Sequence, residues 1–318
     1  MYFTSLPNHK EPGFDEQLHF NKFRQHNIIF NAVSGKSQCV NHIGCLSIKT
    51  VLSGEEWYGI DNRQLAVRPG QFLILNDDQK YSSTIDTHEK THVLSVFFRK
   101  EFALSVFRDV LCSDDSLLDI PFESGGKPLE FFQTLYDTDS KLQNRLLGLI
   151  NSLNKYGYEN NMVDEQLFFL LSDLIRTQKK EMHRVNQVNA IKASTRLEIY
   201  KRICIVKDLL HSNYMENLNL MNISSTACIS VPQLIRHFKA AFQTTPHQYL
   251  TRIRLTNAAR LLKHTSSPVL DISTMCGFEN VSAFCRAFKL EHGVQPRNYR
   301  KANCKIEHFC TFPSLPKI

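Results

Sequence analysis

The sequence predicts an α+β protein: an N-terminal antiparallel β-barrel with accessory helices, then an all-α C-terminal domain with two helix-turn-helix units. Three observations predict this. Short strand-like runs separated by turn residues fill residues 28–99, leucines recur at helical spacing within residues 141–178, and one helical pattern occurs twice between residues 223 and 299. A chain of 318 residues is long enough for two domains with ordinary cores.

The N-terminal half shows short apolar or alternating runs that predict strands. The runs cover residues 44–52, 64–68, 71–75 and 92–98. Turn formers such as Ser53-Gly54 and Pro69-Gly70 separate them, which is typical of an antiparallel barrel or sandwich. A barrel of this size commonly encloses a pocket. Trp57 and Tyr58 are candidates either for the pocket lining or for plain core.

The histidine and cysteine spacings do not favour a metal centre. On a strand, His88 and His92 would lie on one face about 13 Å apart, too far to share a metal. Cys304, His308 and Cys310 match no common zinc pattern. We therefore expect no metal, no cofactor and no enzymatic activity. The alternative is a barrel enzyme or small-molecule-binding protein whose helical tail carries it to nucleic acid.

Two leucine stripes predict amphipathic helices within residues 141–178. Their members are Leu142, Leu146, Leu149 and Leu153, then Leu167, Leu171 and Leu174. Such helices could cover the barrel. Residues 179–195 are polar without an apolar stripe and predict a linker. The expected division is thus a domain over 1–178, the linker 179–195, a second domain over 196–303, and a tail over 304–318.

Composition places the excess positive charge in one region. Residues 197–301 hold 14 lysines and arginines against 6 acidic residues, a net charge of +8, whereas the whole chain carries +7. This is the footprint of a polyanion-binding module. The first residues contain no signal-peptide pattern, no apolar run is long enough to span a membrane, and the nine cysteines form no Cys-x-x-Cys pair. We expect a cytoplasmic protein.

The repeated pattern spans residues 223–249 and 272–299. Matching positions differ by 49 before the turn and by 50 after it, so one copy has an extra residue in its turn. Each copy reads as a short helix, a tight turn and a second helix, the arrangement that places the second helix in a DNA major groove. In the first copy Ser230 is the N-cap candidate and Gln233, Arg236, His237 and Lys239 form the free face.

The second copy uses the same design. Gly277 supplies the turn and Asn280 or Ser282 can cap the helix. Phe284 and Phe288 anchor it, in the way that Leu234, Phe238 and Phe242 anchor the first. Ser282, Arg286 and Lys289 point away from that core.

The run of residues 277–289, followed by 296–300, resembles the DNA-binding domain of the AraC/XylS family of transcription regulators. The resemblance covers about a third of the chain. It implies that residues 249–262 belong to a long helix joining the two reading units, and that the N-terminal barrel is cupin-like, as the turn at residues 68–72 also indicates. Three positions depart from the family pattern: Ser224 and Ser273 replace Ala, and Gln243 replaces a helix-ending Gly. A left-handed Gln243 would cost about 1 kcal/mol.

The resemblance implies the residues that meet DNA. The base-facing positions are Pro232, Gln233, Ile235 and Arg236 in the first helix and Ser282, Ala283 and Arg286 in the second. The expected phosphate contacts are Lys239, Lys289 and Arg254, with Ser230 at the helix start beside them. Either arginine could instead pair with a structural carboxylate such as Asp271 or Glu279.

The expected function is a sequence-specific transcription regulator, an activator that responds to a small molecule through its N-terminal domain. Its expected partners are double-stranded DNA, RNA polymerase, a small-molecule effector and a second copy of the chain. The resemblance implies that the helices of residues 141–178 form the dimer contact, and the alternative is that they only cover the barrel. No membrane association is expected.

Overall fold

The computed structural model of this protein describes residues 1–8, 11, 13–111 and 130–303. The chain divides into two compact units, 1–197 and 198–318, and each is treated by itself. The predicted tail, with its cysteines and histidine, lies outside the described residues. No described helix combines the length and the apolar character needed to cross a membrane.

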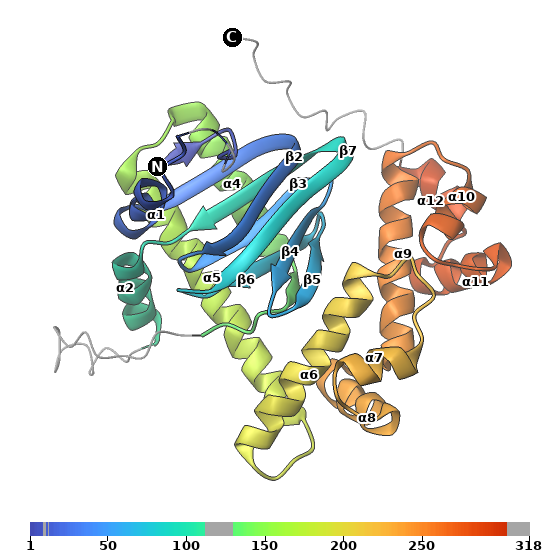
Figure 1. Ribbon diagram of the computed structural model, residues 1–318. Helices are drawn as coiled ribbons and strands as arrows, with labels where there is room; N and C mark the ends of the chain where they lie inside the picture. The colour runs from blue at the N-terminus through green and yellow to red at the C-terminus, as the bar shows by residue number, and fades with distance from the viewer. Residues whose placement is uncertain (9–10, 12, 112–129, 304–318) are drawn as a thin grey trace. The chain divides into compact units, whose positions relative to one another are not determined.

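The first unit is built around an eight-stranded, near-closed barrel that is antiparallel except at β1 (Figure 1). Its strands are β1 (Tyr2–Phe3), β2 (Ile28–Ile43), β3 (Ser47–Ser53), β4 (Glu56–Ile60), β5 (Arg63–Val67), β6 (Gln71–Leu75), β7 (Lys80–Phe97) and β8 (Leu135–Asp137). The path runs β1-β2-β7-β3-β6-β8, and β4 pairs with both β5 and β7. The long β7 therefore pairs with β2, β3 and β4 and holds the sheet together.

The predicted strands are confirmed at β3, β5, β6 and the end of β7. The length of β7 was not anticipated, since it begins at Lys80 and continues through polar residues that pair with β2 and β4. Tyr58 belongs to the barrel core and is 1% exposed. His92 lies on β7 within 2.6 Å of Asn31 Oδ1 through Nε2. Among the described side chains, no group of three or more His, Cys, Asp or Glu could hold a metal.

Within the residues that the structure describes, four helices accompany the barrel: α1 (Glu16–Gln25), α2 (Lys100–Leu111), α4 (Ser140–Tyr156) and α5 (Asn160–Gln187). The Asp139 side chain caps α4 by accepting from the backbone N–H of Leu142, and Gly157 ends that helix with a φ of 74°. Every leucine of the two predicted stripes is buried within the single chain. The stripes therefore form core within one chain, and a dimer contact through residues 141–178 stays a prediction.

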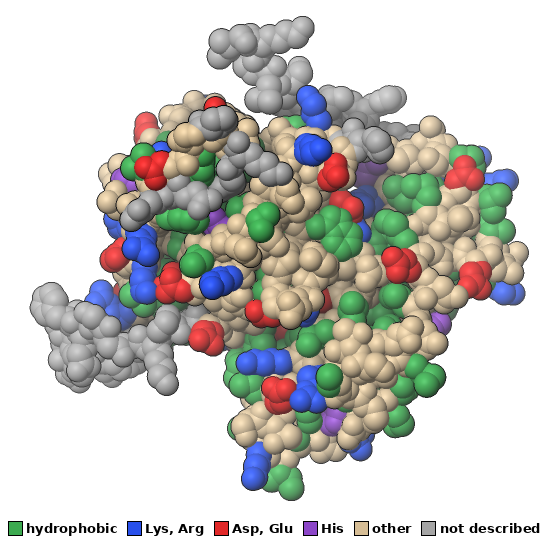
Figure 2. All heavy atoms as spheres, in the orientation of Figure 1, with side chains coloured by type: hydrophobic (Ala, Val, Ile, Leu, Met, Phe, Trp, Pro, Cys, Tyr) green, Lys and Arg blue, Asp and Glu red, His purple; other side chains and the backbone are tan. Residues whose placement is uncertain are grey.

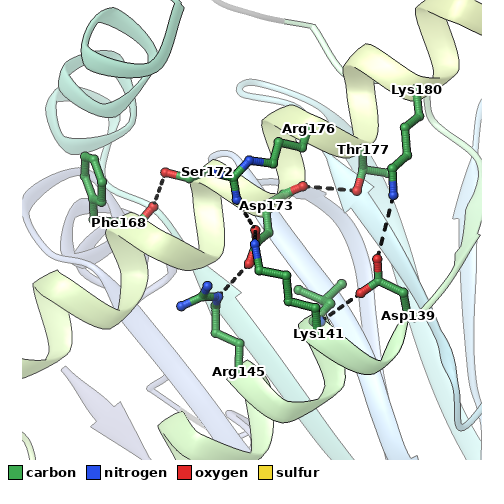
Figure 3. Close-up of polar contacts among 10 residues, drawn as sticks. Asp139, Lys141, Arg145, Phe168, Ser172, Asp173, Arg176, Thr177 and Lys180 are labelled. Atoms are coloured by element: carbon green, nitrogen blue, oxygen red, sulfur yellow. Dashed lines mark hydrogen bonds and ion pairs between the residues drawn. The ribbon is translucent and has the colours of Figure 1, made fainter.

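A charged cluster fastens α4 to α5 (Figure 3). The Asp173 carboxylate accepts from Lys141 Nζ at 2.8 Å, Arg145 Nε at 2.6 Å and Arg176 Nη1 at 2.7 Å. Burial opposes ionisation of Asp173, but the hydrogen bonds from Lys141 and Arg145 outweigh it and lower the pKa of this carboxyl. One buried carboxylate thus orders three cations on the outside of the hairpin.

The prediction of a linker over residues 179–195 is wrong in its first half. Helix α5 continues to Gln187, and only residues 188–192 lie between it and α6. The helix persists because Glu181, Val185 and Val188 are buried, and Glu181 is paired with Arg184 one turn later. The buried face of this part of α5 includes the charged residue Glu181, so the sequence shows no apolar stripe there.

The second unit is all helical. Its helices are α6 (Ala193–Ser212, which begins just before the unit), α7 (Leu220–Thr226), α8 (Val231–Phe242), α9 (Pro246–His264), α10 (Val269–Met275), α11 (Val281–His292) and α12 (Pro296–Asn303). Helix α9 begins with Pro246 in its first turn and a capping box between Thr245 and Gln248. Its 19 residues, about 28 Å long, confirm the expected long connecting helix (Figure 1).

Candidate nucleic-acid interface

Helices α7–α8 and α10–α11 are two copies of one helix-turn-helix unit, each packed on α9 or its neighbours. The ring of Phe238 lies 5.4 Å from that of Tyr249 at 78°, and the ring of Phe288 lies 5.3 Å from that of Tyr299 at 82°. These pairs are 50 residues apart in the chain. The repetition read from the sequence is therefore a repetition of packing geometry.

Helix α9 serves both units. Near its start, Tyr249 packs on Phe238 and Phe242 of α8. Further along, its apolar face forms one buried cluster with α10 and α11. That cluster comprises Leu255, Ala258, Ala259, Leu262, Ile272, Cys276, Phe284 and Phe288. A single rigid helix thus fixes the separation and the orientation of α8 and α11.

The turn of each unit contains a left-handed residue, and the two copies solve it differently. In the first copy Cys228, exposed to solvent, has a φ of 50°. In the second, Gly277 has a φ of 79°, and a Cβ there would lie 2.8 Å from the carbonyl oxygens of Tyr214 and Met215. Because backbone atoms cannot yield as a flexible side chain can, this position accepts only glycine without rearrangement.

The family departures noted in the sequence have local explanations. The hydroxyls of Ser224 and Ser273 are buried, and they donate to the carbonyls of Met221 and Leu270 at 2.9 and 2.7 Å. Gln243 ends α8 with a φ of 59°, as predicted. Its amide donates to the Ala240 carbonyl at 2.9 Å.

Helix α8 presents the predicted reading positions on its outer side. Pro232, Gln233, Arg236 and Lys239 are exposed, and Ile235 is partly buried. Ser230 occupies the N-cap position, where its hydroxyl donates to Gln233 Oε1 at 2.9 Å rather than accepting from the backbone. His237 does not belong to this face. It is 3% exposed, and burial and then the charge of Arg236 lower its pKa.

Helix α11 presents the matching set. Ser282, Arg286 and Lys289 are exposed, and Ala283 is partly buried. Asn280 is the cap, because its side chain accepts from the backbone N–H groups of Ser282 and Ala283. Within the described ranges neither Arg236 nor Arg286 is ion-paired to a carboxylate, and Glu279 instead accepts from Asn217 at 3.0 Å. The described residues therefore offer no ion pair that would support a structural role for Arg236 or Arg286.

Arg254 has a different position from the one expected of a phosphate contact. Its Nε donates to the Tyr214 carbonyl at 2.8 Å, and its Nη2 donates to the Glu216 carbonyl at 2.7 Å. Burial is the main cause of its lowered pKa. The guanidinium holds the segment after α6 against α9, beside the turn at Gly277. Two of the Arg254 donors thus position this segment, and the predicted phosphate contact of Arg254 stays a prediction.

One positioning residue was missed from the sequence. Arg202 Nη1 on α6 donates to the carbonyl of Cys228 at 2.7 Å, so it ties the left-handed turn of the first unit to α6. No local pattern signals this pair, because 26 residues separate donor and acceptor.

On the face of the molecule in Figure 2, blue lysine and arginine side chains are interspersed with red acidic ones. The net positive charge of this unit is therefore not gathered into one patch on that face.

Two further residues that the sequence analysis passed over lie inside the barrel. Lys49 on β3 and Glu56 on β4 are 3% and 6% exposed, and both line a partly open cavity of the barrel. The available signal was their parity: Lys49 shares the inward side of its strand with Val51, a core residue.

Comparison with known proteins agrees with this geometry. A family model described as a helix-turn-helix domain matches residues 223–302. The probable transcriptional regulator LumQ of Photobacterium leiognathi is 23% identical over 270 residues, covering 83% of this chain and 93% of LumQ. The transcriptional activator RhaS of Escherichia coli is 30% identical over 100 residues, covering 31% of this chain and 36% of RhaS.

Among solved structures, a transcriptional regulator with an AraC-type DNA-binding domain from Chromobacterium violaceum is 26% identical. It covers 36% of this chain and 98% of that chain, with a TM-score of 0.32. LumQ is matched over most of its length, whereas RhaS and two further curated relatives are matched over about a third of their own length or less.

Proposed function

We propose that this chain, a DNA-binding transcription regulator with an AraC-type helix-turn-helix domain, activates its target promoters in response to a small molecule bound by its N-terminal barrel. The DNA-binding role follows from the domain that residues 223–302 match. Activation is supported by RhaS, which is named an activator. LumQ and RhaS are both named as regulators, so we propose a regulatory and not a catalytic role.

We further propose that α8 and α11 enter successive major-groove segments on one side of the duplex. The observation that carries this is the pair Arg236 and Arg286, exposed at equivalent places on two helices that share α9. Arginine can donate two hydrogen bonds to guanine, and a separation near one helical turn of about 34 Å suits successive groove segments.

The remaining contacts divide by chemistry. Gln233 can pair with adenine, Ser282 can donate or accept, and Ile235 and Ala283 offer apolar contact to thymine methyls, with Pro232 at the helix start. Lys239 and Lys289 reach from the last turns of α8 and α11, where a cation contacts phosphate without reading sequence. Ser230 sits at the N-terminus of α8, a place where phosphate oxygens are favoured.

We also propose that the chain acts as a homodimer and contacts RNA polymerase at the promoter. Because the leucines of α4 and α5 are core, a dimer contact in residues 141–178 would use their outer side. Phe169 is 44% exposed there, with the Arg145 guanidinium 5.2 Å from its ring centroid. An exposed aromatic beside ordered cations is typical of interface centres.

Selection of sites from random DNA by the full chain tests these proposals. We expect enrichment of two short motifs about ten base pairs apart, and binding that weakens with salt by about 0.9 log units per log unit for each phosphate neutralised. Sedimentation of the same preparation is expected to show a dimer that Phe169→Glu converts to monomer, while Lys155→Glu, on the exposed side of α4, does not. No enriched motif would contradict the reading role, and an unchanged dimer would exclude this face.

A further inference from the structure

The inward face of the barrel carries charged groups in an otherwise apolar core. Lys49 and Glu56 line a cavity of about 50 Å³, together with Tyr58, Ser83 and Ser95. The surrounding core includes Leu65 of β5, Leu73 of β6 and Val93 of β7, which are 0–1% exposed. Such a cavity has room for several water-sized groups, which fits a ligand of few non-hydrogen atoms.

Burial makes both charges unfavourable. Burial raises the pKa of Glu56, although hydrogen bonds from Tyr58 and Ser83 and the charge of Lys49 oppose the rise. Burial lowers the pKa of Lys49 to about 8, against the charge of Glu56. The Lys49 ammonium lies 3.4 Å from the centroid of the Phe97 ring. Buried charged groups in a cavity are unfavourable for stability, and their presence is typical of a binding site.

Much of the rest of the cavity wall is aromatic, beside Leu6, Pro7, Ser37 and Cys39. Phe23 of α1 packs edge-on against Phe97 at 4.6 Å between centroids, and Phe30 of β2 lies 5.9 Å from Phe97. His42 packs against Phe23 and against Tyr81 of β7. The wall therefore offers apolar ring surface beside the two charges, a combination that suits an apolar side chain attached to a charged head.

We propose that this cavity binds a small α-amino acid as a zwitterion, with its carboxylate at Lys49, its ammonium at Glu56 and its side chain against Phe23, Phe30 and Phe97. The inference rests on the proposed function, in that the amino acid would be the effector. Lys49 and Glu56 partly compensate each other's charge. A ligand that carries both charges can pair with both side chains at once, whereas a simple carboxylic acid or a simple amine can pair with only one of them.

Isothermal titration calorimetry of the full chain against the twenty standard amino acids tests the proposal. We expect at least one amino acid to bind, and the matching acid without its amino group and amine without its carboxyl group each to bind at least tenfold more weakly. Absence of any binding amino acid, or a deaminated acid that binds as tightly, overturns the proposal.

Variants assign the two charges. Lys49→Met is expected to weaken binding of the amino acid at least tenfold. Glu56→Gln is expected to reverse the preference, so that the deaminated acid now binds better than the amino acid, an effect that a purely structural role would not produce. Lys36→Met, on the exposed side of β2, is the matched control and should leave binding unchanged. The double variant Lys49→Met/Glu56→Gln, with circular dichroism, shows that the barrel folds without the pair.

The DNA selection experiment separates the two levels of inference. A chain that selects DNA sites but binds no amino acid overturns the ligand and leaves the regulator standing. A chain that binds an amino acid but selects no DNA does the reverse. Unaltered affinity in both Lys49→Met and Glu56→Gln would place the ligand elsewhere and overturn this cavity as its site.

Discussion

The two helix-turn-helix units share their aromatic packing and differ at the residues where the backbone turns left-handed. The first unit places Cys228 and Gln243 at these points, and the second places Gly277 and Gly293. The first therefore carries strain of about 1 kcal/mol or more at each point, which glycine would avoid. The glycine of the second unit is imposed at Gly277 by the carbonyls packed against it, whereas Gly293 has open space around it.

This comparison separates two reasons for a glycine. At one position the backbone angle alone favours it, so another residue is tolerated at a modest cost. At the other, close approach of Tyr214 and Met215 adds a steric requirement that no other residue meets. The substitutions below test this distinction.

The largest effect is expected from Gly277→Ala. The new Cβ would lie 2.8 Å from two backbone carbonyl oxygens in a left-handed conformation, so we expect a loss of about 2–5 kcal/mol in the free energy of unfolding. Urea unfolding of the full chain, with hydrogen exchange in α11 as a local readout, measures it. Cys228→Ala is the control, because it leaves a non-glycine residue in place and should change stability by less than about 1 kcal/mol.

A second comparison concerns Arg236 and Arg286. Because a bidentate pair with guanine discriminates by about 1–3 kcal/mol, each arginine changed to Ala should weaken specific binding roughly ten- to a hundredfold and leave non-specific binding little changed. Fluorescence anisotropy on the selected site and on a scrambled duplex measures both. Arg252→Ala, whose guanidinium pairs with Glu291 at 3.2 Å, is the matched control.

The two units would prove unequal if only one arginine responded. Should Arg286→Ala lower thermal stability and spare the affinity, that arginine is structural and the second helix reads DNA through other residues.

The smallest effect is expected at the helix ends. Gln243→Gly should stabilise the chain by about 0.5–1 kcal/mol, since relief of the left-handed strain exceeds the added freedom of the unfolded chain. Gly293→Gln should destabilise it by a similar amount, because nothing lies within 4 Å of a Cβ there and only the backbone angle matters. Thermal unfolding of the two variants and of the double variant checks both signs. Equal signs would contradict the strain argument.

Sequence patterns predicted the helical part of the chain, from residue 198 on, better than the barrel part, residues 1–197. Phe238, Tyr249, Phe288 and Tyr299 are part of the repeat read from the sequence. Each Phe–Tyr contact joins consecutive helices, and its two residues are only 11 positions apart in the chain. The barrel interior is closed by strands far apart in the chain, such as β2 and β7, so the burial of Lys49 and Glu56 inside it was not visible. The end of α5 was missed because Glu181, a charged residue, is buried.

The predicted interface was limited in the same way. The exposed faces of α8 and α11 follow from local periodicity, and all the predicted base-facing positions on them are at least partly exposed. The position of Arg254 depends on a carbonyl 40 residues earlier in the chain, and the burial of His237 depends on neighbouring helices. Contact of the predicted base-facing positions with DNA stays a prediction.

The left-handed turn of the first unit has a practical consequence for labelling. Cys228 is the exposed thiol among the cysteines that the structure describes, whereas Cys204 and Cys276 are buried. Burial raises the pKa of the Cys276 thiol to about 12, so it stays protonated and slow to react with alkylating reagents at neutral pH. A fluorophore attached at Cys228 would sit in the turn before α8, two residues before the N-cap Ser230, where it could report DNA engagement by the first helix-turn-helix unit separately from the second.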